Sequence, residues 1–183
     1  MQFVNVRKIA FAGVVAALYA TLTMAVAPIA YGPIQFRIAE VLCILPFFFP
    51  YAAPGLFVGC VVANLLSPYG ILDVIAGSIA TLVAALLTMR LGHINKDAVA
   101  VKALACFPPV LCNAVIIGAV IARSVTTGTG GGISGGGYWP AFAIYGMQVG
   151  VGQLVVMYAA GLPLMIYLPK SHIFMRMSEQ YNM

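Results

Sequence analysis

The chain has 183 residues, of which 63% are hydrophobic and 7% are charged, whereas about 25% of the residues in a soluble domain are charged. So few charges cannot cover a surface that faces water, which excludes an ordinary soluble protein and makes lipid the expected solvent. The net charge of +5 comes from nine Lys and Arg residues. They are scattered one or two at a time, so they form no basic stripe that could follow a nucleic-acid backbone.

Apolar segments follow one another along the chain and are predicted to be transmembrane helices. In chain order they cover about residues 8–27, 37–49, 53–66, 71–90, 98–123 and 138–168. Arg7 and Lys8 run straight into the first segment, which is therefore expected to be a retained helix and not a cleaved signal. The last segment is long enough to tilt or bend, and Gly161 and Pro163 permit a bend.

The second and third segments can form one long helix or two short ones, because three prolines interrupt the apolar run. The positive-inside rule decides between the two topologies. Two short helices place both termini in the cytoplasm and put seven basic residues on the cytoplasmic side, with Arg37 and Arg123 outside. The seven are Arg7, Lys8, Arg90, Lys96, Lys102, Lys170 and Arg176. One long helix leaves only three basic residues inside, which violates the rule. The sequence therefore predicts an all-α integral membrane bundle of six helices.

On this topology the polar residues collect in the outer half of the bundle. Two of the four carboxylates, Asp97 and Glu179, fall in cytoplasmic segments that water can reach. A charge at the centre of a helix that faces lipid costs about 2.5 to 3.5 kcal/mol, so the remaining polar residues are expected to face the interior and to line an outward-facing pocket. The candidate ligand-binding residues are Arg37, Glu40, Asn64, Asp73, Asn113, Trp139, Tyr145 and Gln148.

Each candidate also has a purely structural interpretation. Arg37 and Glu40 are spaced i, i+3 and can simply pair with each other. Asp73 follows a Ser-Pro-Tyr-Gly turn near a helix start, where it can act as a cap or as a partner of the helix dipole. The three amides can be hydrogen-bond partners between helices, and Trp139 can be an anchor at the membrane interface. The shared depth of these residues is what favours a pocket.

Small residues at a spacing of four predict close contacts between helices. Ala12, Ala16 and Ala20 form a smooth face along the first helix, on which another helix can pack. Two glycine pairs have the same spacing, and packing inside the chain is the default for them: Gly55/Gly59 and Gly146/Gly150.

The remaining motifs mainly exclude other functions and other kinds of site. The cysteines at 43, 60, 106 and 112 lie in apolar runs and are expected to be small buried hydrophobes, with a disulfide or a metal site as the alternative. The segment 126–137 has the GxGxxG spacing of a dinucleotide site but no preceding strand, so we expect an external loop that can act as a lid. No GxxxxGK[ST] motif occurs, so an ATPase that drives uptake would be another chain.

Several stretches of the first half resemble the QueT family in order and spacing. They are AVAPIAYGPIQFRIAE at 25–40, LPFFFP at 45–50, PGLFVGC at 54–60, ANLLSPYG at 63–70 with Asp73, and GSIATL at 77–82. The resemblance implies a six-helix S component, the substrate-binding subunit of an energy-coupling factor (ECF) transporter in the bacterial plasma membrane. The implied substrate is a queuosine precursor, 7-aminomethyl-7-deazaguanine or queuine.

The resemblance also implies partner chains. Such proteins dock a transmembrane coupling (T) subunit through an alanine-rich face of the first helix, and two cytosolic ATPases drive that subunit. Ala12, Ala16 and Ala20 are the matching residues here. No cofactor and no metal ion are expected.

Three other functions remain open at this stage. One is a stand-alone carrier for another small solute, and a second is a structural membrane subunit. The third is an intramembrane enzyme, which is disfavoured because the two histidines, His93 and His172, are predicted to lie on the cytoplasmic side, far from Glu40 and Asp73.

Overall fold

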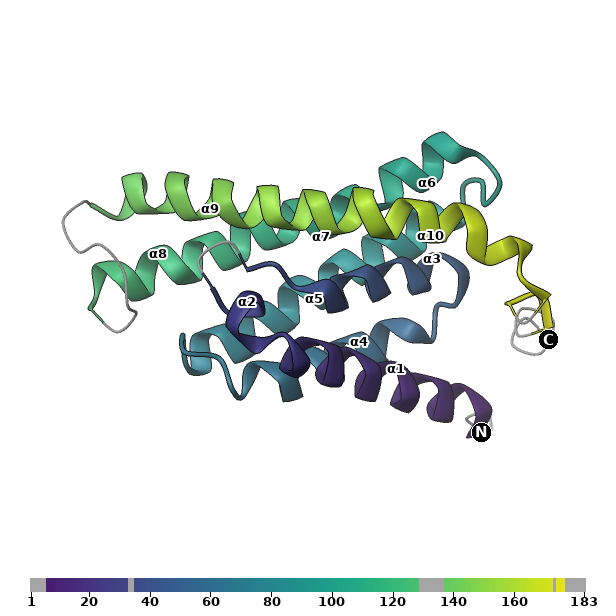
Figure 1. Cartoon of the computed structure of the whole chain (residues 1–183), viewed down its shortest axis with the longest axis horizontal. Helices are drawn as coiled ribbons and strands as arrows, with labels where there is room; N and C mark the ends of the chain where they lie inside the picture. The colour runs from purple at the N-terminus through teal and green to yellow at the C-terminus, as the bar shows by residue number, and fades with distance from the viewer. Residues whose placement is uncertain (1–5, 33–34, 129–136, 173, 177–183) are drawn as a thin grey trace.

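The computed structural model describes residues 6–32, 35–128, 137–172 and 174–176. Every regular element in this part of the chain is helical, and the helices run side by side along one long axis (Figure 1). Four helices are long and apolar enough to cross a membrane: Val6–Ala25, Ile71–Gly92, Val99–Thr126 and Tyr138–Lys170. Two shorter apolar helices, Ile38–Phe48 and Ala52–Asn64, lie between the first and the second of these. The protein is therefore an all-α membrane protein, as its composition predicts.

Several of these helices are divided into shorter elements. The first half comprises α1 (Val6–Ala25), α2 (Ala27–Ala30), η1 (Ile38–Ile44), α3 (Leu45–Phe48), α4 (Ala52–Asn64) and α5 (Ile71–Gly92). The second half comprises α6 (Val99–Ala105), α7 (Phe107–Cys112), η2 (Asn113–Ile117), α8 (Gly118–Thr126), α9 (Tyr138–Val155), η3 (Val156–Gly161), α10 (Leu162–Tyr167) and η4 (Leu168–Lys170). Proline occupies the first turn of α2, where its missing N–H would have no helical partner in any case. Prolines also occupy the first turns of α3, α7 and α10, where one helical element passes directly into the next and the missing N–H interrupts the regular hydrogen-bond pattern.

Four of the described segments depart from regular α-helix. Element η1 is a 3₁₀-helix of seven residues, longer than most such runs, η4 is a short 3₁₀-helix, and η2 and η3 are π-helical turns. The π-helical turn η3 ends at Gly161, with Pro163 in the following turn, which is where the sequence permits the last helix to bend. Irregular turns of this kind often occur at functional sites because they re-aim side chains.

One of the close contacts between helices joins α1 to α4. A Cβ built on Gly55 would collide with the backbone of Ala12, and one built on Gly59 would lie 2.6 Å from the carbonyl oxygen of Ala16. The alanine face of α1 therefore packs largely inside the chain, and Ala20 is buried there. Small residues on both helices allow this approach, which gains dispersion energy where lipid offers no hydrophobic driving force.

The chain begins and ends its helical path at the same end of the bundle. In Figure 1 the start of α1, α3, α6 and α10 lie at one end, and the end of α8 and the start of α9 lie at the other. Most of the glycine-rich segment (residues 129–136) and Glu179 lie outside the described residues, and so do the predictions made for them.

Candidate functional site

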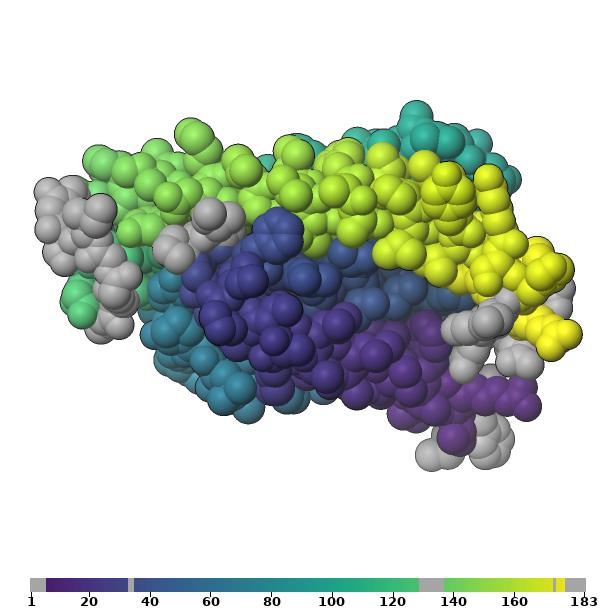
Figure 2. All heavy atoms as spheres, viewed as in Figure 1, coloured from purple at the N-terminus to yellow at the C-terminus, as the bar shows by residue number. Residues whose placement is uncertain are grey.

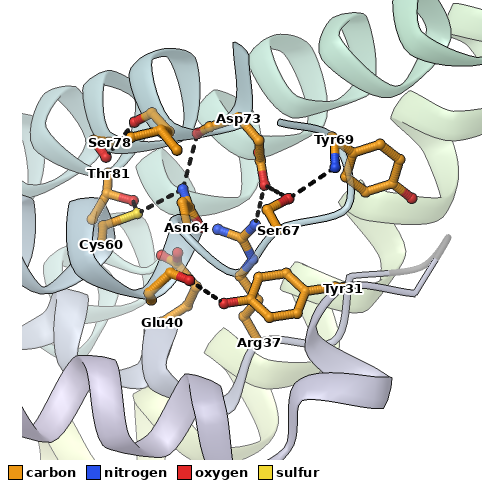
Figure 3. A network of polar contacts seen from close by, with 12 residues as sticks. Tyr31, Arg37, Glu40, Cys60, Asn64, Ser67, Tyr69, Asp73, Ser78 and Thr81 are labelled. Carbon is orange, nitrogen blue, oxygen red and sulfur yellow. Dashed lines mark hydrogen bonds and ion pairs between the residues drawn. The ribbon is translucent and has the colours of Figure 1, made fainter. Parts of the chain in front are cut away.

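An ion pair inside the bundle joins two helices that are remote in sequence. Arg37 lies directly before η1, and its Nη2 is 3.1 Å from Oδ2 of Asp73, in the first turn of α5. Both side chains are buried. Ser67 Oγ, in the turn before α5, donates a 2.5 Å hydrogen bond to the same carboxylate oxygen. Figure 3 shows the guanidinium pointing toward Asp73. The pairing of Arg37 with Glu40, which their spacing allows, is thus replaced by a pairing across 36 residues.

The other buried carboxylate, Glu40, has only neutral partners in the described part of the chain. Tyr19 Oη of α1 donates a hydrogen bond of 2.6 Å to Oε1, and Cys43 Sγ donates one of 3.2 Å to Oε2. Glu40 and Tyr19 are fully buried. A buried carboxylate that forms no ion pair is costly, and the nearby Arg37 is already paired with Asp73.

Asn64, at the end of α4, connects α4 to α5. Its Nδ2 donates to the backbone carbonyl of Asp73 at 2.9 Å and lies 3.4 Å from Cys60 Sγ (Figure 3). Gly77 makes room for this side chain, because a Cβ at that position would lie 2.5 Å from Nδ2. The amide is therefore held in place from both sides, while its oxygen remains available.

Buried polar atoms without a hydrogen-bond partner occur in both halves of the described chain. Among the described residues the buried donors without a hydrogen bond are Gln35 Nε2, Arg37 Nε and Asn113 Nδ2, and the acceptors are Oδ1 of Asn64, Oδ1 of Asp73, Oε1 of Gln148 and Oε1 of Gln153. The large majority of buried side-chain polar atoms in proteins have a hydrogen-bond partner, so each exception requires an explanation. Four of the seven exceptions belong to the first half of the chain, at Gln35, Arg37, Asn64 and Asp73.

Comparison with known proteins connects this site to a transport family. Residues 9–170 match the family described as QueT transporter. The chain belongs to the QueT family. Over 72 residues it is 44% identical to the queuosine precursor transporter QueT of Lactococcus lactis subsp. cremoris (strain MG1363). That match covers 38% of this chain and 42% of the relative, so it spans less than half the length of either protein. No solved structure matches the chain.

Family membership confirms the resemblance inferred from the sequence and assigns the chain to multi-pass membrane transport proteins. The ion pair between Arg37 and Asp73 and the hydrogen-bonded Asn64 all come from the half of the chain that carried the resemblance. They form one connected polar network at the start of η1 and the ends of α4 and α5 that face it.

The candidates of the second half occupy different surroundings. Asn113 is buried and opens the π-helical turn η2. Gln148 on α9 is half-buried, with its Oε1 inside the bundle, and Tyr145 packs with Tyr69 at the edge of an apolar cluster. Trp139 is 74% exposed and packs edge-on against Tyr138 and Phe142. The structure thus turns the two amides inward and leaves the tryptophan on the surface.

Sequence reasoning missed four residues of the site. Tyr19 lies in an apolar run, Ser67 in a turn, and Gln35 and Gln153 in segments without a charged neighbour at helical spacing that would draw attention to them. Tyr69, in the turn before α5, also lies near Asp73, and burial followed by the charge of Asp73 raises the pKa of its hydroxyl. That phenol therefore stays neutral at physiological pH. Amide and hydroxyl side chains near Arg37 and Asp73 were the signal that could have identified the missed residues.

The QueT family member also has a groove with an apolar lining. A groove of about 500 Å³ runs between α1, η1 and α10 and is lined by apolar side chains, among them Phe11, Leu42, Leu45 and Leu164. In Figure 2 the blue atoms of η1 and α3 are visible between the purple atoms of α1 and the yellow-green atoms of α9 and α10. All the residues that line this groove are apolar, so it suits a lipid chain better than a charged solute.

Proposed function

We propose that this QueT family member is the substrate-binding S component of an ECF-type importer. It captures a queuosine precursor, 7-aminomethyl-7-deazaguanine or queuine, from outside the bacterial cell. Partner subunits then use ATP to carry the precursor inward. Three facts support the proposal: the family match, the name of the Lactococcus lactis relative, and the absence of a GxxxxGK[ST] motif in the sequence.

We infer the class of ligand from the buried polar atoms that have no hydrogen-bond partner. A deazaguanine presents N–H donors beside one carbonyl acceptor along a single edge. Asp73 Oδ1 and Asn64 Oδ1 offer two free acceptors next to each other, and Arg37 Nε and Asn113 Nδ2 offer free donors. Carboxylates and amides suit such an edge because they can accept two hydrogen bonds or both donate and accept. We assign the guanine edge to Asp73 and Asn64.

The charge balance of the polar network favours a cationic substituent. Counted at their ordinary charges, Arg37 contributes +1, and Asp73 and Glu40 contribute −1 each, which leaves −1. Because Arg37 already pairs with Asp73, the excess charge lies on Glu40. An aminomethyl group supplies one positive charge. We therefore assign Glu40 to the amine of the ligand, with Tyr19 and Cys43 holding the carboxylate in position.

The topology belongs to the same proposal. Six membrane crossings, with both termini in the cytoplasm, require α3 and α4 to meet on the cytoplasmic side and α8 and α9 on the outer side, in agreement with their places in Figure 1. All four native cysteines are buried, so a single added cysteine gives a clean labelling signal. Thr127→Cys should react with an impermeant maleimide added to whole cells, and Lys96→Cys should react only after the cells are opened. The reverse pattern would refute the topology.

Docking of the coupling subunit is proposed on α1. Ala12 and Ala16 already contact α4, whereas Gly13 and Ala17 are exposed beside them, and a Cβ on Gly13 would meet nothing. Bulky residues at these exposed positions should therefore block uptake without loosening the chain. Uptake by cells should fail for Ala17→Leu and Gly13→Leu, while purified protein should bind ligand normally. Normal uptake by both variants would rule out this face of α1.

The experiment that tests the function is a direct search for the ligand. Native mass spectrometry of the purified protein should reveal a co-purified deazapurine, and calorimetric titration with 7-aminomethyl-7-deazaguanine should show one site. A different bound solute, with uptake that needs no ATPase partner, would favour the stand-alone carrier. No bound solute and no heat of binding would favour a structural subunit.

A further inference from the structure

Gln35 has an unusual backbone conformation. Its φ is +48°, and among the described residues it is the single non-glycine residue with positive φ. This left-handed region is normally reserved for glycine and, less often, for asparagine and aspartate. A glutamine that is held there indicates that the direction of its side chain is worth the strain, because rotation about φ swings Cβ and everything beyond it.

The backbone around Gln35 is fixed from both sides. Its N–H donates to the carbonyl of Gly32 at 2.9 Å, and its own carbonyl accepts the N–H of Arg37 at 2.8 Å. The next residue, Phe36, donates its N–H to the carbonyl of Ile29 in α2. These bonds form two consecutive tight turns that lead the chain from α2 into η1. The conformation of Gln35 is therefore imposed by the local hydrogen-bond pattern, which glycine would satisfy without strain.

The same segment lies against the polar network. Tyr31 donates its hydroxyl to the backbone carbonyl of Ala63, the residue before Asn64, and its ring centre lies 5.6 Å from the guanidinium carbon of Arg37. The segment that carries Gln35 is therefore attached to the end of α4 and packs on the residue that pairs with Asp73. Gln35 is therefore buried two residues before a member of the candidate site.

The side chain of Gln35 is 1% exposed, yet its Nε2 has no hydrogen-bond partner. Arg37 Nε, two residues later, is likewise buried without a partner. An unpaired buried donor is costly, and two of them only two residues apart in one segment are harder to explain by packing alone. Each of these two donors requires an acceptor, and the described part of the chain supplies none.

We propose that Gln35 is a specificity-determining residue whose side-chain amide donates a hydrogen bond to a carbonyl oxygen or ring nitrogen of the bound heterocycle. The left-handed turn is the device that aims this amide. Asp73 and Asn64 supply acceptors and Gln35 supplies a donor. The site can therefore recognise both the donors and the acceptor along one edge of the flat ligand. This inference rests on the proposed function, since it takes a deazapurine as the ligand.

Two substitutions separate a role in binding from a role in folding. Gln35→Gly removes the amide and suits the left-handed φ, so the melting temperature of the purified protein without ligand should stay the same or rise. Its affinity for 7-aminomethyl-7-deazaguanine in titration calorimetry should fall about tenfold or more. Gln35→Glu keeps the length and replaces the donor by an acceptor, so it should lose at least as much affinity. Asp97→Asn, in an exposed loop, is the matched control.

Each outcome of these measurements tests either the role of Gln35 or the proposed function. A lower melting temperature for Gln35→Gly than for the control would make Gln35 a structural residue and overturn the inference, whatever the ligand is. Unchanged affinity of Gln35→Gly would overturn it as well. Failure of the wild-type protein to bind the probe would refute the proposed function instead, and the melting temperatures would still decide whether Gln35 is needed for folding.

Discussion

The two ends of the bundle differ in how well their buried groups are paired and packed. At the polar end, formed by Arg37, Glu40, Asn64 and Asp73 with their neighbours, charges are buried and hydrogen-bonding atoms lack partners. At the aromatic end, Phe47, Phe48, Phe49 and Phe174 stack edge-on or tilted, with ring centres about 5 Å apart. The side-chain hydroxyls near that end, of Thr88 and Tyr158, each reach a backbone carbonyl.

The contacts at the aromatic end stabilise the fold, whereas the unpaired buried atoms at the polar end lower its stability. The aromatic end is packed and satisfied, so it can hold η1, α3 and α10 in place. The polar end contains buried groups without a hydrogen-bond partner, and a bound ligand, as proposed above, would pair them. Beyond the ion pair, substitutions of the unpaired groups at the polar end should change ligand binding, and substitutions at the aromatic end should change stability.

The largest effect is expected from breaking the buried ion pair. Arg37→Met leaves the carboxylate of Asp73 unpaired in the interior, which should destabilise the folded state by about 3 to 5 kcal/mol. Equilibrium unfolding in detergent–SDS mixtures measures this loss. Adding Asp73→Asn to Arg37→Met should recover part of it, because the orphaned charge is removed. The control is Arg123→Met on the exposed face of α8; equal losses for the two single variants would show that the ion pair contributes nothing to stability.

A smaller effect, on binding and not on folding, is expected at Glu40. Glu40→Gln removes the charge assigned to the ligand amine and should weaken binding of 7-aminomethyl-7-deazaguanine by about 2 to 3 kcal/mol. The 7-cyano analogue lacks the amine and serves as the matched ligand. The wild-type protein should prefer the aminomethyl compound, and Glu40→Gln should lose that preference.

The reverse assignment of the carboxylates makes a different prediction for the same pair of ligands. If Asp73→Asn erased the preference for the amine and Glu40→Gln kept it, then Asp73 would meet the amine and Glu40 the guanine edge. Equal binding by both variants and by the Asp97→Asn control would make the polar end structural.

The aromatic end should respond in stability alone. Phe47→Ala opens a cavity where the ring is 2% exposed and should cost about 2 kcal/mol in unfolding free energy, since in lipid mainly the cavity and dispersion terms remain. Ligand affinity, measured by titration below the melting temperature, should be nearly unchanged. Phe107→Ala, at a ring that is 45% exposed, is the matched control and should be close to neutral. A larger effect of Phe47→Ala on affinity than on stability would remove the distinction between the two ends.

Sequence reasoning reached the fold class because composition and segment length dictate it. An apolar run of about 20 residues has to be a spanning helix in lipid, and 63% hydrophobic residues leave no soluble alternative. It reached several residues of the polar end for a related reason: polar groups are expensive in lipid, so Arg37, Glu40 and Asp73 had to turn inward.

The pairing inside the site could not be predicted in the same way. Local spacing favours Arg37 with Glu40, but the partner of Arg37 is Asp73, 36 residues away, and the choice depends on how α5 packs against η1. The π-helical turn at Asn113 and the positive φ of Gln35 leave no periodic signature in the sequence. The alanine face of α1 was expected to meet a partner subunit, yet it meets Gly55 and Gly59 of α4, which the matching spacing of the two small-residue rows also allows.

The smallest effect, and the sharpest test of the polar end, is expected from one methyl group at Gly77. In the middle of a helix, Gly→Ala gains about 1 kcal/mol from helix propensity. At Gly77 the new Cβ would lie 2.5 Å from Asn64 Nδ2, and so it must push that amide off the carbonyl of Asp73. The gain and the lost hydrogen bond, about 1 kcal/mol, should nearly cancel in stability. Affinity for the deazapurine should nevertheless fall about fivefold, because Asn64 Oδ1 moves with its amide. Gly13→Ala in α1, where a Cβ meets nothing within 4 Å, should show the gain in stability with unchanged affinity. If Gly77→Ala behaved like Gly13→Ala in both measurements, the position of Asn64 would be irrelevant to binding, and the guanine edge would have to be read elsewhere.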